Sequence, residues 1–324
     1  MVHGSCNDYG MLLIMSHELY PMNKKHKHIL LTGGTGLIGK HLTGQLLEKG
    51  YVVSHLSRSA GNDDGVKTYL WDVNKSEIDA HCIDGVDTVI HLAGAGIAEE
   101  RWTDERKKEM IDSRTKSIEL IYDLLRGKKH TVNSVISASA IGYYSDRGDE
   151  LLTEKSPPSN DFMAKCCVEW ENAVDKGKAM GLRVVKFRTG VVLDIEGALP
   201  KMTAPVKLFV GAALGNGKQW VPWIHWQDVV NMYLYAIENE NFTGVYNMAA
   251  PNPVTNKQLT KAIAKQLRRP LWAPNVPAFV LKLIMGEMST IVLGSTKVSA
   301  QKIEDEGFKF KFPDIAMALN EIYG

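Results

Sequence analysis

Hydrophobic positions recur along this chain in two alternating patterns. Short apolar runs rich in β-branched residues start at Ile29 and at the segments 51–56, 68–71, 88–92, 134–137 and 182–187. Between them, apolar residues repeat with the period of an amphipathic helix, in a run that ends at Gly50 and near 103–126 and 161–180. Because strands that alternate with helices form parallel sheets covered on both faces, the sequence predicts an α/β, doubly wound fold.

The pattern changes after Gly190, where prolines become frequent and the helical segments shorter. We expect a smaller second lobe in this part of the chain. The segment from Ile224 to Glu238, followed by residues 244–247, has the pattern of a helix and a strand that return to the main sheet, so the lobe is expected to be interleaved. The expected division is a disordered extension over 1–26, a sheet domain over 27–250 with 191–223 contributing to the lobe, and a C-terminal domain over 251–324.

Composition narrows the classes of partner. The 324 residues carry a formal net charge of +1, so no overall positive charge attracts a nucleic acid, and we expect a small-molecule substrate. The apolar run 11–15 is far shorter than the roughly 20 residues that span a bilayer and lacks the surroundings of a signal peptide, so no membrane partner is expected. Monomer and homodimer both remain open.

The cysteines bear on metal binding and on the compartment. The chain has four of them, Cys6, Cys82, Cys166 and Cys167, and their positions lack the paired spacing of metal ligands. Neighbouring cysteines on a helix are badly placed to bridge each other. The sequence therefore predicts no metal site and a reducing, cytoplasmic setting.

Glycines mark the turn between the first strand and the first helix. Gly33, Gly36 and Gly39 have the spacing G-x-x-G-x-x-G, directly after the strand and at the start of the helix. Glycine lets backbone N–H groups approach a pyrophosphate, and the helix N-terminus adds free donors and partial positive charge. The sequence therefore predicts a Rossmann-type, dinucleotide-binding sheet. The residues of this turn expected to contact the dinucleotide are Gly33, Thr35, Gly36, Leu37, Ile38 and Gly39.

The same turn partly fits the phosphate-binding loop of a nucleotide-hydrolysing enzyme. Such a loop needs Ser or Thr after its lysine to hold Mg²⁺, and an aspartate at the end of a later strand. In this chain His41 follows Lys40, and the fourth strand ends without an acid, in the sequence IHLAG of residues 90–94. We therefore exclude that class of site.

The end of the second strand bears on the choice between NAD and NADP. In NAD-binding proteins an acid about twenty residues after the turn accepts hydrogen bonds from the ribose. Here the strand leads into Arg58, and no acid appears until Asp63. Arg58 suits a 2′-phosphate because its planar guanidinium can bond phosphate oxygens bidentately, so we expect NADP(H), with NAD less favoured. Asp72, after the third strand, could accept from the adenine amino group or equally cap a turn.

Several motifs resemble the extended short-chain dehydrogenase/reductase superfamily. They are residues 32–39 (TGGTGLIG), 91–94 (HLAG), 137–144 (SASAIGYY) and 223–229 (WIHWQDV). More narrowly, residues 101–103 (RWT), 112–114 (DSR), 167–171 (CVEWE) and 188–193 (RTGVVL) resemble the nucleoside-diphosphate-sugar epimerase-like subfamily, which carries a C-terminal domain of unassigned function similar to residues 269–313. The resemblance implies a Rossmann-type fold, an NAD(P) cofactor and contacts to it from Leu92, Ala93 and Gly94.

The same resemblance implies a site built from a serine, a tyrosine and a lysine, with tyrosine and lysine four residues apart on a helix. The phenol exchanges a proton while hydride moves to or from the nicotinamide. The serine falls at Ser139, but Phe162 and Cys166 stand at the other two positions. Because a phenyl ring cannot donate a proton, we expect a substitute in Tyr143 or Tyr144, which follow the strand of Ser139 at the carboxyl edge of the sheet.

Two functions remain open on these grounds. The first is an NADP(H)-dependent oxidoreductase or epimerase-like enzyme that acts on a small polar or nucleotide-linked substrate in the cleft between sheet and lobe. The second is a non-catalytic NADP(H)-binding regulatory or scaffold protein, since some relatives are labelled cell-division regulators. The absent Tyr-x-x-x-Lys pair favours the second, whereas the glycine turn and Arg58 are expected under both.

Overall fold

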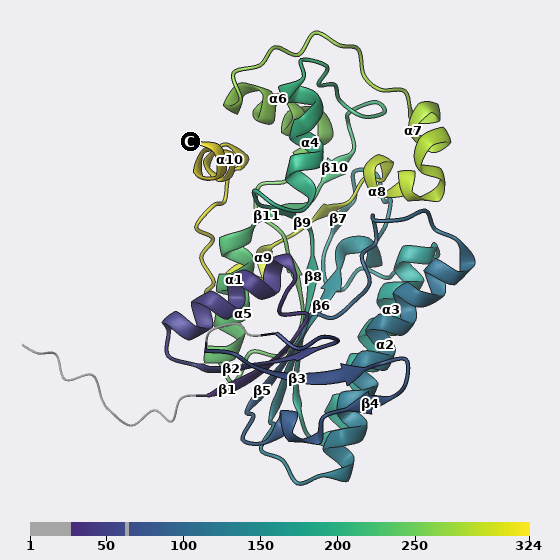
Figure 1. Cartoon of the computed structure of the whole chain (residues 1–324). Helices are drawn as coiled ribbons and strands as arrows, with labels where there is room; N and C mark the ends of the chain where they lie inside the picture. The colour runs from purple at the N-terminus through teal and green to yellow at the C-terminus, as the bar shows by residue number, and fades with distance from the viewer. Residues whose placement is uncertain (1–26, 62–64) are drawn as a thin grey trace, which may run out of the picture.

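In the computed structural model, which describes residues 27–61 and 65–324, eight strands form one sheet (Figure 1). In spatial order these strands are β12 (Gly244–Met248), β8 (Arg183–Thr189), β6 (Ser134–Ala140), β5 (Thr88–His91), β1 (His28–Thr32), β2 (Val52–Ser57), β3 (Lys67–Asp72) and β4 (Glu77–Ile78). All neighbours pair in parallel except β3 and the short edge strand β4. The extension predicted over 1–26 lies outside the described residues.

Helices cover both faces of this sheet, and strand side chains alternate between two cores. On β1, Ile29 and Leu31 belong to one core and Leu30 to the other. The first core is closed by α1 (Leu37–Glu48), α5 (Trp226–Glu238) and α9 (Gln301–Asp305). The second is closed by α2 (Asp104–Gly127) and α3 (Phe162–Asp175). This arrangement confirms the predicted doubly wound, Rossmann-type fold.

Side-chain caps fix where the two helices of the second core begin. The Thr103 hydroxyl accepts a hydrogen bond from the backbone N–H of Arg106 at the start of α2. The Asp161 carboxylate accepts one from Ala164 at the start of α3. Such caps satisfy backbone donors that the first helical turn leaves free, and each contributes about 1 kcal/mol.

The segment predicted as a helix from Ile224 begins two residues later than expected. Residues Trp223–His225 form the strand β11, which pairs in parallel with β9 (Val191–Leu193), and His225 caps α5 through its own side chain. Pairing with a distant strand overrides the local helical pattern at these residues. After α5 the chain returns to the main sheet as β12 beside β8, as predicted.

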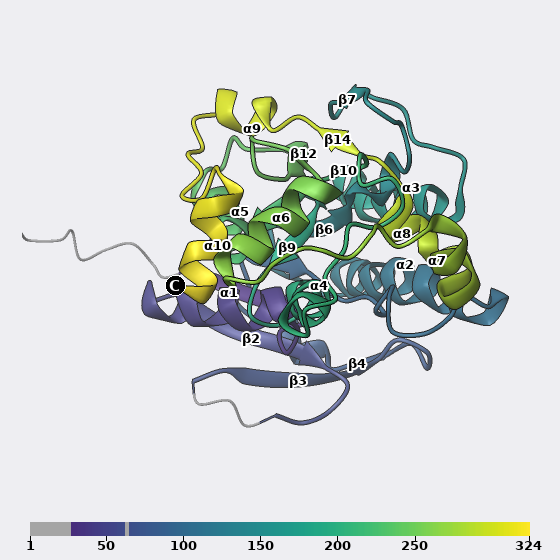
Figure 2. The same ribbon diagram turned by 90° about the horizontal axis from the view of Figure 1, so that it is seen from above.

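The smaller lobe lies above the carboxyl edge of the sheet (Figures 1 and 2). A third core joins α4 (Ala198–Lys207), α6 (Asn256–Gln266) and α10 (Ile315–Tyr323). Two more helices, α7 (Ala278–Met285) and α8 (Ser289–Leu293), lie between α6 and α10 in the chain. They are tied to the start of α2, where Arg101 donates to the carbonyl of Ile284 and Lys107 pairs with Glu287. The remaining short strands are β7 (Leu151–Leu152), β10 (Trp220–Val221), β13 (Val254–Thr255) and β14 (Lys297–Val298).

Candidate functional site

The glycine turn between β1 and α1 leaves no room for side chains. Gly33 has φ +69°, and a Cβ there would lie 3.0 Å from the carbonyl carbon of Leu92. A Cβ on Gly39 would overlap the carbonyl oxygen of Gly33 and lie 2.7 Å from the Cα of Gly34. Gly36 precedes α1 with no side-chain cap, and the first turn carries no acid. Within the turn the Gly36 N–H donates to the Gly33 carbonyl oxygen at 3.0 Å, so it is the N–H groups of the first turn of α1 that can meet a pyrophosphate.

The loop that follows β5 lies directly against this turn. The Thr32 hydroxyl oxygen accepts hydrogen bonds from the backbone N–H groups of Leu92 and Ala93, each at 3.0 Å. Gly94 is exposed and adjoins the Arg114 side chain, whose Cζ would lie 3.0 Å from a Cβ at that position. The structure therefore brings residues 92–94 next to the glycine turn, although the two segments are about sixty residues apart in sequence.

Arg58 and Asp72 lie where two neighbouring strands, β2 and β3, reach the carboxyl edge of the sheet. Arg58 directly follows β2, is exposed, and forms no ion pair or hydrogen bond with a described residue. The Asp72 Oδ1 accepts hydrogen bonds from the backbone N–H groups of Lys75 at 3.2 Å and Asn74 at 3.0 Å. These bonds lower the pKa of the Asp72 carboxyl, and the bond from Lys75 has the larger effect. Asp72 thus caps a turn, one of the two roles predicted, while the Arg58 guanidinium has no partner among the residues that the structure describes.

Below the loop after β6 lies a buried ion pair. The Arg188 guanidinium on β8 bonds the Glu171 carboxylate on α3 bidentately, with Nε to Oε1 at 2.7 Å and Nη2 to Oε2 at 2.9 Å. The Ser139 hydroxyl donates to Oε1 at 2.8 Å, and Lys186 lies 3.4 Å from Oε2. Burial raises the pKa of Glu171, but the bonds from Arg188 outweigh it, so the pKa lies below its usual value. Both groups are therefore charged and paired.

The two adjacent tyrosines stand in different surroundings. Tyr144 is fully buried; its hydroxyl donates to Asn247 Oδ1 at 2.8 Å and accepts from Arg188 Nη1 at 2.8 Å. Burial raises the pKa of Tyr144 to about 12. Tyr143 is half-buried, its ring centroid lies 3.4 Å from Arg188 Cζ, and its hydroxyl bonds no described residue. Of the two phenols, only that of Tyr143 lacks a hydrogen-bond partner within residues 27–61 and 65–324. We call these six residues the Arg188 cluster: Ser139, Tyr143, Tyr144, Glu171, Arg188 and Asn247.

The start of α3 provides no such phenol. Phe162 is its first residue, and its ring packs edge-on against Trp102 with centroids 5.3 Å apart. Cys166 is buried, and burial raises the pKa of its thiol. Lys165 is exposed. Neither the phenyl ring nor the buried thiol can replace a tyrosine and lysine pair.

Between the glycine turn and the Arg188 cluster lies His91, the last residue of β5. It is completely buried, with Nδ1 3.0 Å from Ser137 Oγ and Nε2 2.7 Å from Ser117 Oγ. Burial, with a smaller contribution from the charge of Arg114, lowers the pKa of His91 to about 3. The imidazole is therefore neutral near pH 7, and its two nitrogens are occupied by hydroxyls of the protein.

Sequence analysis did not single out Glu171 and Asn247. Glu171 lies on the buried face of α3, between Cys167 and Val174 at helical spacing. A charged residue at an apolar helical position was the available signal, because such charges need a buried partner. Asn247 gave no comparable signal, since its partner Tyr144 is 103 residues away.

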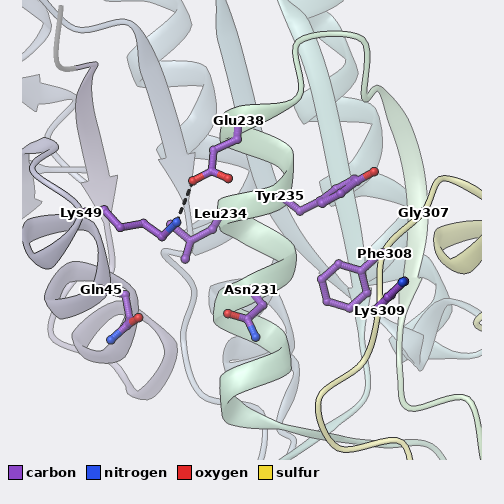
Figure 3. A pocket seen from close by; sticks show the side chains of 9 residues that line it. All are labelled: Gln45, Lys49, Asn231, Leu234, Tyr235, Glu238, Gly307, Phe308 and Lys309. Atoms are coloured by element: carbon purple, nitrogen blue, oxygen red, sulfur yellow. Dashed lines mark hydrogen bonds and ion pairs between the residues drawn. The ribbon is translucent and has the colours of Figure 1, made fainter. Parts of the chain in front are cut away.

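A shallow pocket of about 390 Å³ lies elsewhere, between the C-terminal halves of α1 and α5 and residues 307–309 (Figure 3). Lys49 and Glu238 form an ion pair of 3.0 Å across it. None of the predicted site residues lines this pocket. Within residues 27–61 and 65–324, no group of three or more His, Cys, Asp or Glu is placed to hold a metal ion, and no helix there is long and apolar enough to cross a membrane.

Comparison with proteins of known structure supports this architecture. The chain is 28% identical to the human epimerase family protein SDR39U1 (isoform 2), solved with NADPH; the TM-score is 0.81, over 91% of this chain and 99% of that one. It is 31% identical to a nucleoside-diphosphate sugar epimerase from Corynebacterium glutamicum, with a TM-score of 0.76, over 92% of this chain and 58% of that one.

Sequence comparison gives the same family. The chain is 37% identical over 297 residues to the epimerase family protein YfhF of Bacillus subtilis, covering 91% of this chain and 97% of that protein. Residues 29–249 match the model of the NAD dependent epimerase/dehydratase family, and residues 276–322 match a domain of unknown function, DUF1731. Together with the extended short-chain dehydrogenase fold, these matches show that the chain belongs to the NAD dependent epimerase/dehydratase family.

Proposed function

We propose that this protein binds NADP(H) along the carboxyl edge of the sheet and transfers hydride to or from a small polar or nucleotide-linked substrate. The observation that carries the proposal is the pairing of an open glycine turn with an unpartnered phenol, Tyr143, at the same edge. The substrate would lie between that edge and the smaller lobe, as ligands of open α/β sheets do. The NADPH in the human relative's structure supports the choice of cofactor.

Residues from four segments would hold the cofactor. The backbone of Gly33, Thr35, Gly36, Leu37, Ile38 and Gly39 would receive the pyrophosphate, and Leu92, Ala93 and Gly94 would border it. Arg58 would pair with the 2′-phosphate, which the free guanidinium suits. Asp72 would approach the adenine only by giving up the ion pair between its Oδ2 and Lys75 Nζ, which are 3.3 Å apart. A bound nicotinamide supplies hydride chemistry that the side chains of the protein lack.

The protein would handle the proton through Tyr143. In the reducing direction its phenol would give its proton to the carbonyl oxygen as that oxygen becomes an alcohol. The stacked Arg188 fixes the ring and puts a positive charge next to the phenolate that remains. Ser139 and Tyr144 would act as positioning residues, because their hydroxyls are hydrogen-bonded to Glu171 and Arg188 and do not face a ligand.

A second candidate is an NADP(H)-binding regulatory protein without turnover. The observation that favours it is the start of α3, where Phe162 and the buried Cys166 occupy the positions of the usual tyrosine and lysine. Under this function the glycine turn and Arg58 keep their roles, and Tyr143 has none in proton transfer. Cofactor binding is common to both candidates, whereas turnover separates them.

Cofactor fluorescence with NADPH and NADH tests the binding site. We expect Arg58→Ala to weaken NADPH binding by about tenfold to a hundredfold, the equivalent of losing a charge-assisted pair, and to change NADH binding little. Arg126→Ala, which removes an exposed arginine at the far end of α2, is the matched control. Equal binding of both cofactors by the wild type would contradict the role of Arg58.

A turnover assay tests the proton donor. Consumption of NADPH is followed with a panel of carbonyl and quinone substrates for Tyr143→Phe and Tyr144→Phe. We expect Tyr143→Phe to lower kcat by about a hundredfold, since general acid catalysis contributes on that order. Turnover unchanged by Tyr143→Phe would refute the assignment. Cofactor binding without turnover on any substrate of the panel would favour the regulatory candidate.

A further inference from the structure

Charge is distributed very unevenly in this chain. Residues 197–227 and 241–286 contain no aspartate or glutamate and nine cations, Lys201, Lys207, Lys218, Lys257, Lys261, Lys265, Arg268, Arg269 and Lys282. Subtracting this charge of +9 from the formal net charge of +1 leaves −8 for all other residues. All nine side chains are exposed, and none pairs with a carboxylate among the described residues. We call the exposed part of these two segments the basic face.

The basic face also carries most of the exposed apolar side chains that the structure describes. Of the fourteen large hydrophobic residues with high exposure in 27–61 and 65–324, eight lie here. They are Leu208, Phe209, Val210, Leu271, Trp272, Phe279, Leu283 and Ile284. On α7 only Leu281 is buried, whereas Phe279 is 71% and Leu283 78% exposed. An apolar helix with this much of its side-chain surface exposed to water indicates a binding surface for an apolar partner.

These side chains belong to one end of the molecule. The Arg269 guanidinium lies 4.5 Å from the ring centroid of Phe209, and Leu214 forms a bridge to Val276 shortly before α7. The segment after α4 and the segment that leads into α7 therefore lie side by side. Figures 1 and 2 place α4, α6 and α7 at the same end of the molecule, above the carboxyl edge of the sheet, with α7 set to the right of the other two.

We propose that the basic face docks onto a membrane surface rich in anionic lipid, a peripheral contact that needs no spanning segment and that the sequence analysis did not predict. Anionic headgroups attract clustered lysines and arginines, and exposed Phe, Leu, Ile and Trp enter the boundary between headgroups and acyl chains. Lys282, between Phe279 and Leu283 on α7, can extend its charged end to the headgroups while its stem stays with the apolar residues. Docking in this way places the smaller lobe between the lipid and the carboxyl edge of the sheet.

A second copy of the chain fits this face less well. A two-fold dimer joins the same patch on both subunits, so two surfaces with nine unpaired cations each would meet. A nucleic acid would satisfy the cations but would leave the aliphatic side chains of α7 exposed. An anionic lipid surface complements both properties at once.

Sedimentation of the purified full chain with vesicles tests the proposal. We expect binding to vesicles of phosphatidylglycerol and phosphatidylcholine, weak binding to pure phosphatidylcholine, and loss of binding as salt screens the cations. The double variant Phe279→Ser/Leu283→Ser is expected to lower the partition coefficient by about tenfold or more. Lys261→Glu/Lys265→Glu is expected to lower it by a similar factor.

Leu70→Ser is the matched control, because Leu70 on β3 is 51% exposed and lies outside the basic face. It should bind vesicles like the wild type, and circular dichroism checks that every variant folds. Absence of binding to anionic vesicles, or equal binding to neutral ones, would overturn the proposal. So would concentration-dependent self-association, without vesicle binding, that Phe279→Ser/Leu283→Ser removes; the face would then belong to a second copy.

Discussion

The glycine turn and the Arg188 cluster lie at the same edge of the sheet but are built in opposite ways. The turn depends on missing side chains: four of its seven residues, Gly33, Gly34, Gly36 and Gly39, are glycines, and a Cβ on Gly33 or Gly39 would press against backbone. The cluster depends on side chains from β6, α3, β8, β12 and the loop after β6, which bury a charged pair. The first is open for a ligand, whereas the second is nearly closed. The difference suggests that binding and rigidity are divided between the two regions.

The largest effect on stability is expected in the cluster. Glu171→Gln leaves the buried Arg188 without its carboxylate, and breaking a buried pair from one side costs about 3–5 kcal/mol. Urea unfolding of the wild type and the variant measures the change in the free energy of unfolding. If the two regions are independent, the variant should still bind NADPH with nearly unchanged affinity under conditions where it stays folded.

Glu169→Gln controls for the loss of a carboxylate on the same helix. Glu169 lies on α3 two residues before Glu171, but it is exposed and forms no ion pair with a described residue. Its substitution should change the free energy of unfolding by less than about 0.5 kcal/mol. Similar effects of the two substitutions would show that the buried pair contributes nothing, and the contrast between the regions would fail.

The next largest effect is expected on cofactor binding, at the turn. A Cβ on Gly39 collides with the backbone of Gly33 and Gly34, so Gly39→Ala must shift the donors that face the pyrophosphate. We expect NADPH affinity to fall by about a hundredfold, or roughly 3 kcal/mol. Titration of cofactor fluorescence measures it.

The same helix provides the control for this substitution. A Cβ on Gly44 meets nothing within 4 Å, and Gly44 lies inside α1. Gly44→Ala should leave NADPH binding intact and stabilise the fold by about 0.5–1 kcal/mol, because glycine loses more backbone entropy in a helix. Wild-type affinity in Gly39→Ala would show that the close packing of the turn does not matter for the cofactor.

The same contrast explains what could be predicted from the sequence. The turn and the strand and helix pattern follow from local spacing, whereas the role of Leu92, Ala93 and Gly94 was implied by the resemblance; the structure has the turn and these residues at one edge. Strand order also places Ser139 and the tyrosines at that edge. Local pattern failed at Ile224, where pairing with the distant β9 decides the conformation.

The hydrogen-bond partners within the Arg188 cluster could not be deduced from local spacing or strand order. Whether Tyr143 or Tyr144 is free depends on Asn247 and Arg188, which lie on strands reached through the smaller lobe and through α3. Sequence spacing gives the strand on which a residue lies, but the direction of each side chain follows from packing between elements. Only the assembled structure distinguishes the two phenols.

The smallest of these effects on stability is expected at His91. This residue lies on β5, between the strand that leads into the glycine turn and the strand that leads into the cluster. His91 pairs with Thr32 at the start of the glycine turn and with Ser137 on β6. Its pKa is lowered in the folded state to about 3, so at pH below 6.5 the unfolded chain binds a proton that the folded protein excludes. Stability contributed by the neutral imidazole is therefore complete above pH 6.5 and is lost as the pH falls toward 3.

Between about pH 7.5 and pH 5 this loss amounts to about 2 kcal/mol, at 1.36 kcal/mol for each unit of pKa difference. The wild type should lose that much more free energy of unfolding over this interval than His91→Gln, whose amide does not titrate. His81→Gln, at an exposed histidine, should follow the wild type. Identical pH profiles for the wild type and His91→Gln would mean that a charged imidazole is tolerated between the regions. The junction would then be open to water, and the turn and the cluster could no longer be treated as separate environments.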